Sequence, residues 1–350
     1  MDDAAIRRWW ECGRLEAPPG ARVTVSGSDP VLASRHRPGE AAAAALGLLG
    51  AWSARIAEQR GGPPQRVQVD TTSAAASLLG FLFQSAERLD LTRGQTPLTA
   101  FYPTADDRWI HLHGGFPHLA DGLTALLGCD VTSEDVGRAV GNWRAEPLEE
   151  AVADAGLCAA VARTRTEWLA HPQGAALGGL GALSIRRIGD APPRHRRLND
   201  PHFNDPSEND PPVTDLSLNG PSVGGRPLSG VRVADLTRVL AGPTCGRSLA
   251  AHGADVLRIG SPQLPSIEPY VVETGRGKRC AFVDLDDPAG VRRLRDLVAD
   301  ADVFCQGYRP GSLAARGLGA EELARLAPGI VYVSINCYGQ VGPWAGRARW

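Results

Sequence analysis

The stretch LSGVRVADLTRVLAGPTCGRSLAAHGADVLRIG, residues 228–260, decides the fold class of this chain. Its apolar run 231–236 predicts a buried strand, and residues 246–252 predict a short helix. Gly253 is placed to end that helix in a left-handed conformation, and residues 254–259 predict a second buried strand. Because strand, helix and strand follow one another closely, the stretch predicts an α/β fold with a parallel sheet.

The turn between the first strand and the helix is suited to an anion. At Ala241-Gly242-Pro243 the start of a helix presents backbone N–H groups, and the helix dipole adds positive potential there. The dinucleotide fingerprint G-x-G-x-x-G is absent, and Gly260 stands where a ribose-binding acid would lie. A nicotinamide-dependent oxidoreductase is therefore disfavoured. Taken alone, the stretch would favour an ordinary βα turn.

Further motifs follow at regular places towards the C-terminus. They are GKR at 277–279, FVDLD at 282–286, ADV at 301–303, YRPG at 308–311, RGLG at 316–319 and SINCYG at 334–339. In this order and spacing, residues 228–344 resemble the N-terminal half of the class III CoA-transferase family, which includes formyl-CoA transferase and α-methylacyl-CoA racemase.

The resemblance implies a fold and an activity. The fold is a Rossmann-like parallel-sheet CoA-binding domain with a smaller α+β domain. The activity moves CoA between an acyl-CoA and a carboxylic acid through an acidic nucleophile. Coenzyme A and acyl-CoA would be substrates, with no permanently bound cofactor, and the chain would form a homodimer.

Composition and charge are those of an ordinary globular protein. The 350 residues are enough for two domains, with 22% charged and 43% hydrophobic residues. The net charge of −2 indicates neither a nucleic-acid partner nor an anionic membrane surface. The seven cysteines have no C-x-x-C spacing, and we identify no signal peptide or apolar stretch of about 20 residues. We therefore expect a cytoplasmic protein without a metal site.

The sequence divides into four parts. They are a helical part at 1–100 resembling the later portion of the family's large domain, a small α+β domain at 101–190, a Pro/Asp/Asn-rich linker at 191–227, and the Rossmann-like domain at 228–350. This order puts the family's later part before its beginning. The chain is therefore either a fused tandem whose second copy stops early, a permuted single unit, or a fragment of a longer product.

Local patterns predict individual elements in the first 190 residues. Thr71 or Thr72 is expected to cap a helix that runs through Gln84. Residues 163–176 resemble the family's small domain, where a helix ends in a His-Pro-Gln-Gly turn, so a helix is expected to end at 171–174. The other expected elements are a helix at 37–58, a strand at 66–70, a hairpin at 102–112, and helices at 117–127, 133–140 and 148–155.

The nucleophile that the resemblance implies is missing from its place. Family members carry an aspartate in a loop before an Ala/Leu-rich helix, and Arg37 aligns with it here. Glu40 is a weak candidate for a substitute, and Asp29 lies nearby in sequence. A glutamate at a helix start more often matches the helix dipole.

The CoA-binding residues carry over more completely. Arg238, Val239, Leu240 and Ala241 occupy the first βα turn, which wraps CoA in the family. The resemblance also assigns Lys278 or Arg279 to the nucleotide phosphates, Tyr308 to the adenine, and Arg316 to a place one residue beyond the family's phosphate-binding arginine.

Three histidines, His111, His113 and His118, gather around the expected hairpin. No carboxylate or cysteine at a fixed spacing completes a metal-ligand set with them. We interpret them as surface or core residues. The alternative function for the whole chain is a non-catalytic, CoA-binding or structural relative that pairs with an active subunit.

Overall fold

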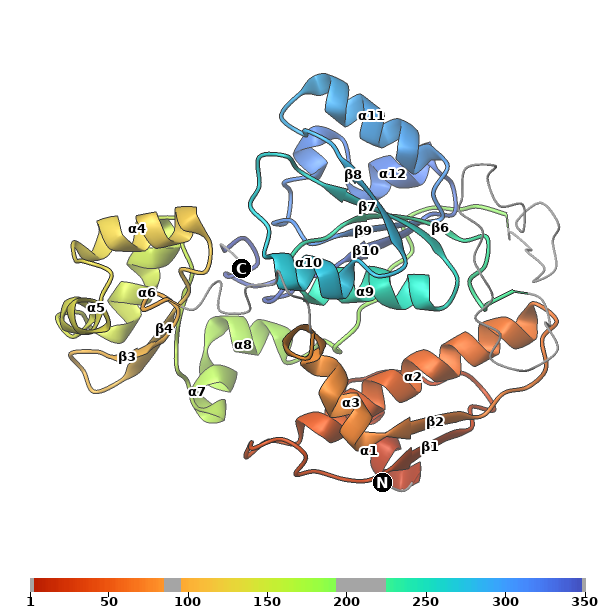
Figure 1. Ribbon diagram of the computed structural model, residues 1–350, viewed down its shortest axis with the longest axis horizontal. Helices are drawn as coiled ribbons and strands as arrows, with labels where there is room; N and C mark the ends of the chain where they lie inside the picture. Colours follow the sequence, from red (N-terminus) through yellow and green to blue (C-terminus); the bar gives the residue numbers. More distant parts are fainter. Residues whose placement is uncertain (1–2, 85–95, 193–224, 348–350) are drawn as a thin grey trace.

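The computed structural model describes residues 3–84, 96–192 and 225–347, and they form three packed units (Figure 1). The expected linker at 191–227 lies largely outside the described residues. Among the described residues, no helix combines the length and the apolar character needed to cross a bilayer.

The first unit is a small parallel α/β layer. Strand β1 pairs in parallel with β2, and α2 connects them across a core that includes Ile6, Trp10 and Val25. Its elements are α1 (Asp3–Cys12), β1 (Val23–Ser26), α2 (Pro38–Gln59), β2 (Val67–Asp70), α3 (Thr71–Leu78) and a 3₁₀ turn at Gly80–Leu82. The expected helix at 37–58 and strand at 66–70 are confirmed within one residue at each boundary.

One expectation for this unit was wrong, and one strand was not predicted. The helix expected to run through Gln84 ends at Leu78, and its cap is Asp70, whose carboxylate accepts the Ser73 amide at 2.8 Å. Strand β1 lies in a segment to which we assigned no element from the sequence, although its residues Val-Thr-Val-Ser alternate between buried and exposed. Pairing with β2 determines its conformation.

The second unit packs three helices on a three-stranded antiparallel sheet. Strand β4 lies between β3 and β5, and β3–β4 is the expected hairpin. Helices α4, α5 and α6 bury Leu123, Val136 and Leu148 against Ile110 of the sheet. The elements are β3 (Phe101–Pro103), β4 (Trp109–Leu112), α4 (Pro117–Leu127), α5 (Ser133–Val140), α6 (Ala145–Asp154) and β5 (Ala159–Val161).

Two short helices follow β5, where a single helix was expected. They are α7 (Arg165–Ala170) and α8 (Pro172–Leu177). A helix does end at the His-Pro-Gln-Gly sequence, since His171 is the C-cap of α7, but the same sequence also begins a second helix. Pro172 disfavours helical geometry at His171, and His171 then caps α8 through a hydrogen bond from the Gln173 amide to Nδ1, at 3.1 Å.

Lowering the pH is expected to weaken this cap. Burial and Arg163 lower the pKa of His171, with Glu149 opposing and Arg347 adding to the decrease. Accepting the Gln173 amide requires a neutral Nδ1. Because the folded-state pKa lies below the unfolded value, the stabilisation is complete above about pH 6.5 and is lost as the pH falls through the folded pKa.

Urea denaturation at about pH 7.5 and pH 5.5 tests this prediction. Asparagine caps helices but does not titrate, so His171→Asn should lose less stability on acidification than the wild type. Burial also lowers the pKa values of His111 and His113, so part of the loss is common to both proteins. Identical pH dependence in the two proteins would contradict a role for His171.

The third unit contains five parallel strands in the order β10-β9-β6-β7-β8. Helices α9 and α10 lie on one face of the sheet, and α11 and α12 lie on the other (Figure 1). The elements are β6 (Arg232–Leu236), α9 (Ala241–Ala251), β7 (Asp255–Gly260), α10 (Glu268–Thr274), β8 (Lys278–Phe282), α11 (Pro288–Ala299), β9 (Val303–Gln306), a 3₁₀ turn (Ala314–Arg316), α12 (Ala320–Leu326) and β10 (Val331–Ser334).

This topology confirms the predicted α/β fold and locates its crevice. Numbered in chain order, the strands are arranged 5-4-1-2-3, which matches the first five strands of the doubly wound Rossmann order 3-2-1-4-5-6, and the strand order reverses between β6 and β9. Gly253 has φ +101° and follows α9 as expected. Helix α9 begins at Ala241, five residues before the predicted start, because the Ala-Gly-Pro corner is itself its first turn.

Candidate functional site

The crevice lies at the carboxyl ends of β6 and β9, where doubly wound sheets bind ligands. Residues 237–240 connect β6 to α9. Val239 has φ +69°, a strained conformation for a β-branched residue and one that clusters at binding sites. Its side chain packs against the core of the second unit, so this unit closes one side of the crevice.

Arg238, Tyr308 and Arg316 come together at this edge. The Arg238 guanidinium lies 5.8 Å from the Phe116 ring centroid and donates to the Pro265 carbonyl. Burial raises the pKa of Tyr308, while the positive charges of Arg238 and Arg316 act in the opposite direction. The phenol is therefore neutral at neutral pH and lies within the field of two guanidinium groups.

Arg316 is held in place by three contacts. It forms an ion pair with Asp286 at 2.7 Å and donates to the carbonyls of Leu285 and Ser312. Leu240 and Ala241 follow Arg238 along the turn, and Ala241 is exposed at the first residue of α9. The structure thus brings together six of the predicted CoA-binding residues: Arg238, Val239, Leu240, Ala241, Tyr308 and Arg316.

The backbone of Lys278 and Arg279 lies at the start of β8, at the amino-terminal edge of the sheet, but the Lys278 side chain extends to the first turn of α9. The Lys278 ammonium is fully buried, 2.8 Å from the Asp235 carboxylate and 2.8 Å from the Pro243 carbonyl. No part of this ammonium is exposed to a phosphate, so the geometry does not support its predicted role. Arg279 is exposed and pairs with Asp255 at 2.5 Å on the neighbouring strand.

Asp235 was not identified from the sequence as a site residue. Its side chain is fully buried on β6, and it accepts hydrogen bonds from the Thr237 amide at 3.0 Å and from Lys278. Gly246 makes room for this pair, because a Cβ there would lie 2.3 Å from a carboxylate oxygen of Asp235 and 2.8 Å from the ammonium. The sequence did contain a sign of it: an acid within the apolar strand sequence RVADL would be buried and would need a partner.

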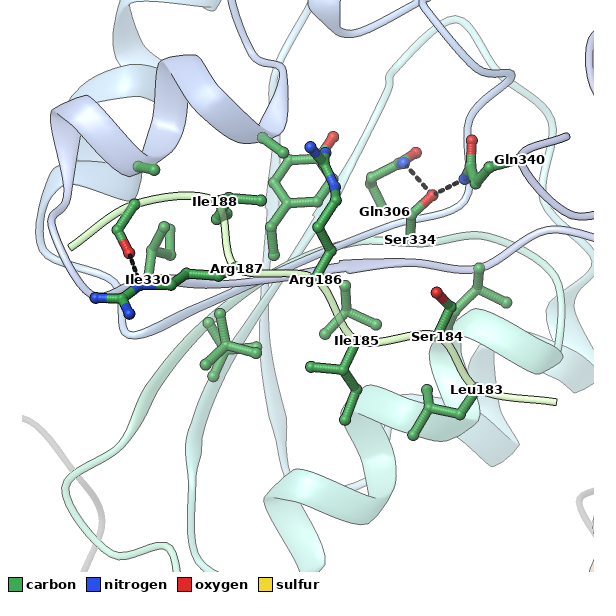
Figure 2. Close-up of a pocket in the computed structure, with 18 of the residues that line it drawn as sticks. Leu183, Ser184, Ile185, Arg186, Arg187, Ile188, Gln306, Ile330, Ser334 and Gln340 are labelled. Carbon is green, nitrogen blue, oxygen red and sulfur yellow. Dashed lines mark hydrogen bonds between the residues drawn. The ribbon is translucent and has the colours of Figure 1, made fainter. Parts of the chain in front are cut away.

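Polar side chains also lie at the ends of β9 and β10. The Gln306 amide donates to the Ser334 hydroxyl at 2.7 Å, and Gln340 donates to the same oxygen at 2.8 Å (Figure 2). All three line an open cleft of about 3060 Å³, which extends along β10 to the segment 183–188. A polar residue that ends a buried strand was the signal that sequence reasoning missed.

Glu40 lies in the first unit, in the first turn of α2. Its side chain is 2% exposed and binds the Arg37 guanidinium at 2.5 Å. Asp29 accepts the amides of Gly39 and Glu40, at 3.2 and 2.8 Å, and caps the helix from outside it. Burial opposes the change, but hydrogen bonds from the Glu40, Val31 and Gly39 amides lower the pKa of Asp29. These contacts favour structural roles for both acids.

The histidines near the hairpin are partly stacked on one another. The His111 and His113 ring centroids lie 6.3 Å apart, and His111 also lies 4.7 Å from the Phe101 ring. His118 stacks on Phe116 at 6.0 Å. Within the described ranges, no group of three or more His, Cys, Asp or Glu residues is arranged to hold a metal ion.

Comparison with known proteins identifies relatives of the third unit. The model of CoA-transferase family III matches residues 228–350. A succinyl-CoA:glutarate CoA-transferase of Mus musculus is 41% identical over 135 residues, which cover 35% of this chain and 31% of that protein. A crystal structure of a CaiB/BaiF family protein from Brucella suis matches 36% of this chain and 37% of its own, with 35% identity and a TM-score of 0.34.

A longer relative extends the similarity towards the N-terminus. An acyl-CoA transferase of Gibberella moniliformis is 34% identical over 273 residues, covering 72% of this chain and 43% of that protein. The matched 72% of the chain is longer than residues 228–350, so the similarity extends into the units before them. The chain spans less than half the length of each of these relatives. Residues 228–350 of this chain belong to CoA-transferase family III.

Proposed function

We propose that this chain binds CoA at the carboxyl edge of the five-stranded sheet and takes part in moving CoA between an acyl-CoA and a carboxylic acid. The observation that carries the proposal is the convergence of Arg238, Tyr308 and Arg316 at the point between β6 and β9 where the strand order reverses. These residues lie within the family match, and the named relatives are CoA-transferases.

The chemistry of the edge suits CoA. Arginine side chains bind phosphate through paired N–H donors, and Arg238 and Arg316 both act on the environment of Tyr308. The phenol ring of Tyr308 offers an aromatic surface for the adenine. Helix α9 begins at the exposed residue Ala241, and its dipole adds positive potential at the same place.

The transfer step requires a carboxylate that accepts the acyl group and CoA in turn. Such a carboxylate must also be shielded from water beside a donor for the developing oxyanion. Glu40 is held by Arg37 and nearly inaccessible, so we do not assign the step to it. We propose a homodimer in the cytoplasm as the working form.

A non-catalytic CoA-binding relative is the second candidate. It is favoured by Arg37, which replaces the aspartate of the family at the aligned position and lies exposed beside α2. Such a chain would bind CoA at the same edge and pair with an active subunit. The two candidates differ in whether a covalent intermediate forms.

Native mass spectrometry with CoA and with acetyl-CoA distinguishes them. A transferase should take up about one CoA per chain and form an adduct with acetyl-CoA that hydroxylamine removes, with the carboxylate located by peptide mapping. CoA uptake without the adduct would support the binding relative. No uptake with either compound would contradict both.

Replacing Arg238 with alanine is expected to weaken CoA binding about tenfold or more, because one charge-assisted contact is lost. Isothermal titration calorimetry of wild type and variant measures the change. Arg279→Ala is the matched control, since Arg279 is also an arginine but pairs with Asp255 at the opposite edge of the sheet. A larger loss in Arg279→Ala than in Arg238→Ala would contradict the carboxyl-edge site.

A further inference from the structure

The side chain of Gln173 joins two parts of the chain that are far apart in sequence. It is fully buried near the start of α8. Its amide nitrogen donates to the carbonyls of Tyr338 and Val341, at 2.7 and 2.8 Å. Its amide oxygen accepts the backbone N–H of Trp344 at 2.7 Å. Both amide hydrogens and one acceptor site are therefore used on a single loop, residues 338–344.

The loop is shaped to fit around α8. Gly342 has φ +84°, and a Cβ there would lie 2.5 Å from the Gln173 amide oxygen. Gly339 has φ +75°, and a Cβ there would lie 2.7 Å from Leu177. Side chains larger than glycine would strain the backbone at both positions and would also meet α8. The loop conformation and the position of Gln173 therefore depend on each other.

Aromatic contacts extend this junction. Trp344 is 5% exposed, and its ring centroid lies 4.4 Å from that of His171 and 5.2 Å from that of Tyr338. The Arg347 guanidinium lies 4.1 Å from the Trp344 ring centroid. The loop thus has a buried anchor on the side that faces α7 and α8.

On its other side the loop borders the candidate site. It directly follows β10, and Gln340 within it bonds to Ser334 at the carboxyl end of that strand. Ser334 in turn bonds to Gln306 (Figure 2). The side-chain oxygen of Gln306 accepts the Tyr308 amide at 2.7 Å. A continuous chain of hydrogen bonds therefore runs from the loop to Tyr308.

We propose that Gln173 is a positioning residue for the CoA site: it holds loop 338–344 at the carboxyl ends of β9 and β10, so that the N-terminal part of the chain completes a site built by residues 228–350. This inference rests on the proposed CoA-binding function. Gln173 touches no ligand in this role and acts through the loop and the hydrogen bonds that end at Tyr308.

The test compares the wild type with Gln173→Met, which keeps the side-chain volume and removes the three hydrogen bonds. Gln84→Met is the matched control, because the Gln84 amide also donates to two carbonyls, those of Phe81 and Pro269, but at a different junction. Calorimetry gives the dissociation constant of CoA, and hydrogen–deuterium exchange reports the loop. Both are measured under conditions where circular dichroism shows each variant folded.

Gln173→Met is expected to raise the dissociation constant about tenfold and to speed exchange in 338–344, with neither change in Gln84→Met. Faster exchange with unchanged affinity would overturn the proposal, since the contact would then be structural alone. Unchanged exchange would also overturn it. A wild type that binds no CoA, with the loop still protected, would overturn the proposed function and this inference with it. Should Gln173→Met not fold, the same two measurements are made on Gln173→Glu, and the same results support or overturn the proposal.

Discussion

Replacing Lys278 with methionine is expected to lower the free energy of unfolding by about 3–5 kcal/mol. The Lys278 and Asp235 side chains are both fully buried, so the variant would leave the Asp235 carboxylate without its counter-charge. The Pro243 carbonyl, at the first turn of α9, would lose a donor as well. Thr237 still donates to the carboxylate, but a neutral donor does not replace a cation.

Urea denaturation of wild type and variant measures this loss. Arg279→Met is the control, because the neighbouring Arg279 forms an exposed pair with Asp255 and should leave the midpoint almost unchanged. Equal losses in the two variants would contradict the buried pair. Calorimetry with CoA on the folded variants would also show whether Lys278 affects affinity, as the sequence resemblance implies.

Replacing Arg163 with methionine should destabilise the second unit by about 3 kcal/mol. Arg163 forms a two-pronged ion pair with Glu149, at 2.8 and 2.5 Å, and the two side chains are 8% and 1% exposed. Glu149 also accepts the Val161 amide at 2.8 Å, so the pair ties α6 to β5. The hydrogen bond to Glu149 raises the pKa of Arg163, as expected for a charge stabilised by its partner.

Hydrogen–deuterium exchange under increasing urea can assign this loss to the second unit. Amides of β4 and β5 should become exposed at lower urea in Arg163→Met, while those of β6 and β9 should not change. The control is Arg138→Met on α5, where the partners Glu134 and Asp135 are at the surface. A loss spread evenly over all three units would contradict a local role for the pair.

The parts of the fold that the sequence predicts correctly are those that depend on neighbouring residues. Apolar runs around residues 231–236 and 254–259 and the glycine at 253 define β6, α9 and β7, because strand burial and helix ends act over a few residues. The hairpin at 102–112 is confirmed for the same reason, since a short polar turn sets its register.

The parts that were wrong or missed depend on distant residues. Lys278 follows a glycine and precedes an arginine, a surface pattern, and only the folded sheet brings it to Asp235, 43 residues away. Gln173 belongs to a short turn motif, and its three partners lie 165 to 171 residues further along. Asp29 caps α2 from ten residues before it. Local patterns carry no information about such partners.

The candidate site shows the same division. The resemblance supplied Arg238, Tyr308 and Arg316, and the topology brings them to one edge because the strands before them, β6 and β9, are neighbours. It also supplied Lys278 and Arg279, whose backbone begins β8 at the other edge, although the Lys278 side chain reaches the first turn of α9. Strand β8 was not located from the sequence. Without the bounds of that strand, the sequence does not tell at which edge of the sheet the two residues lie.

Hydrogen–deuterium exchange of the wild type with and without CoA tests the location of the site most directly. A carboxyl-edge site predicts slower exchange in residues 237–241 and 307–316, with no change at the start of β8. Protection confined to residues 276–279, at the amino-terminal end of β8, would contradict it, and so would uniform exchange in the presence of saturating CoA.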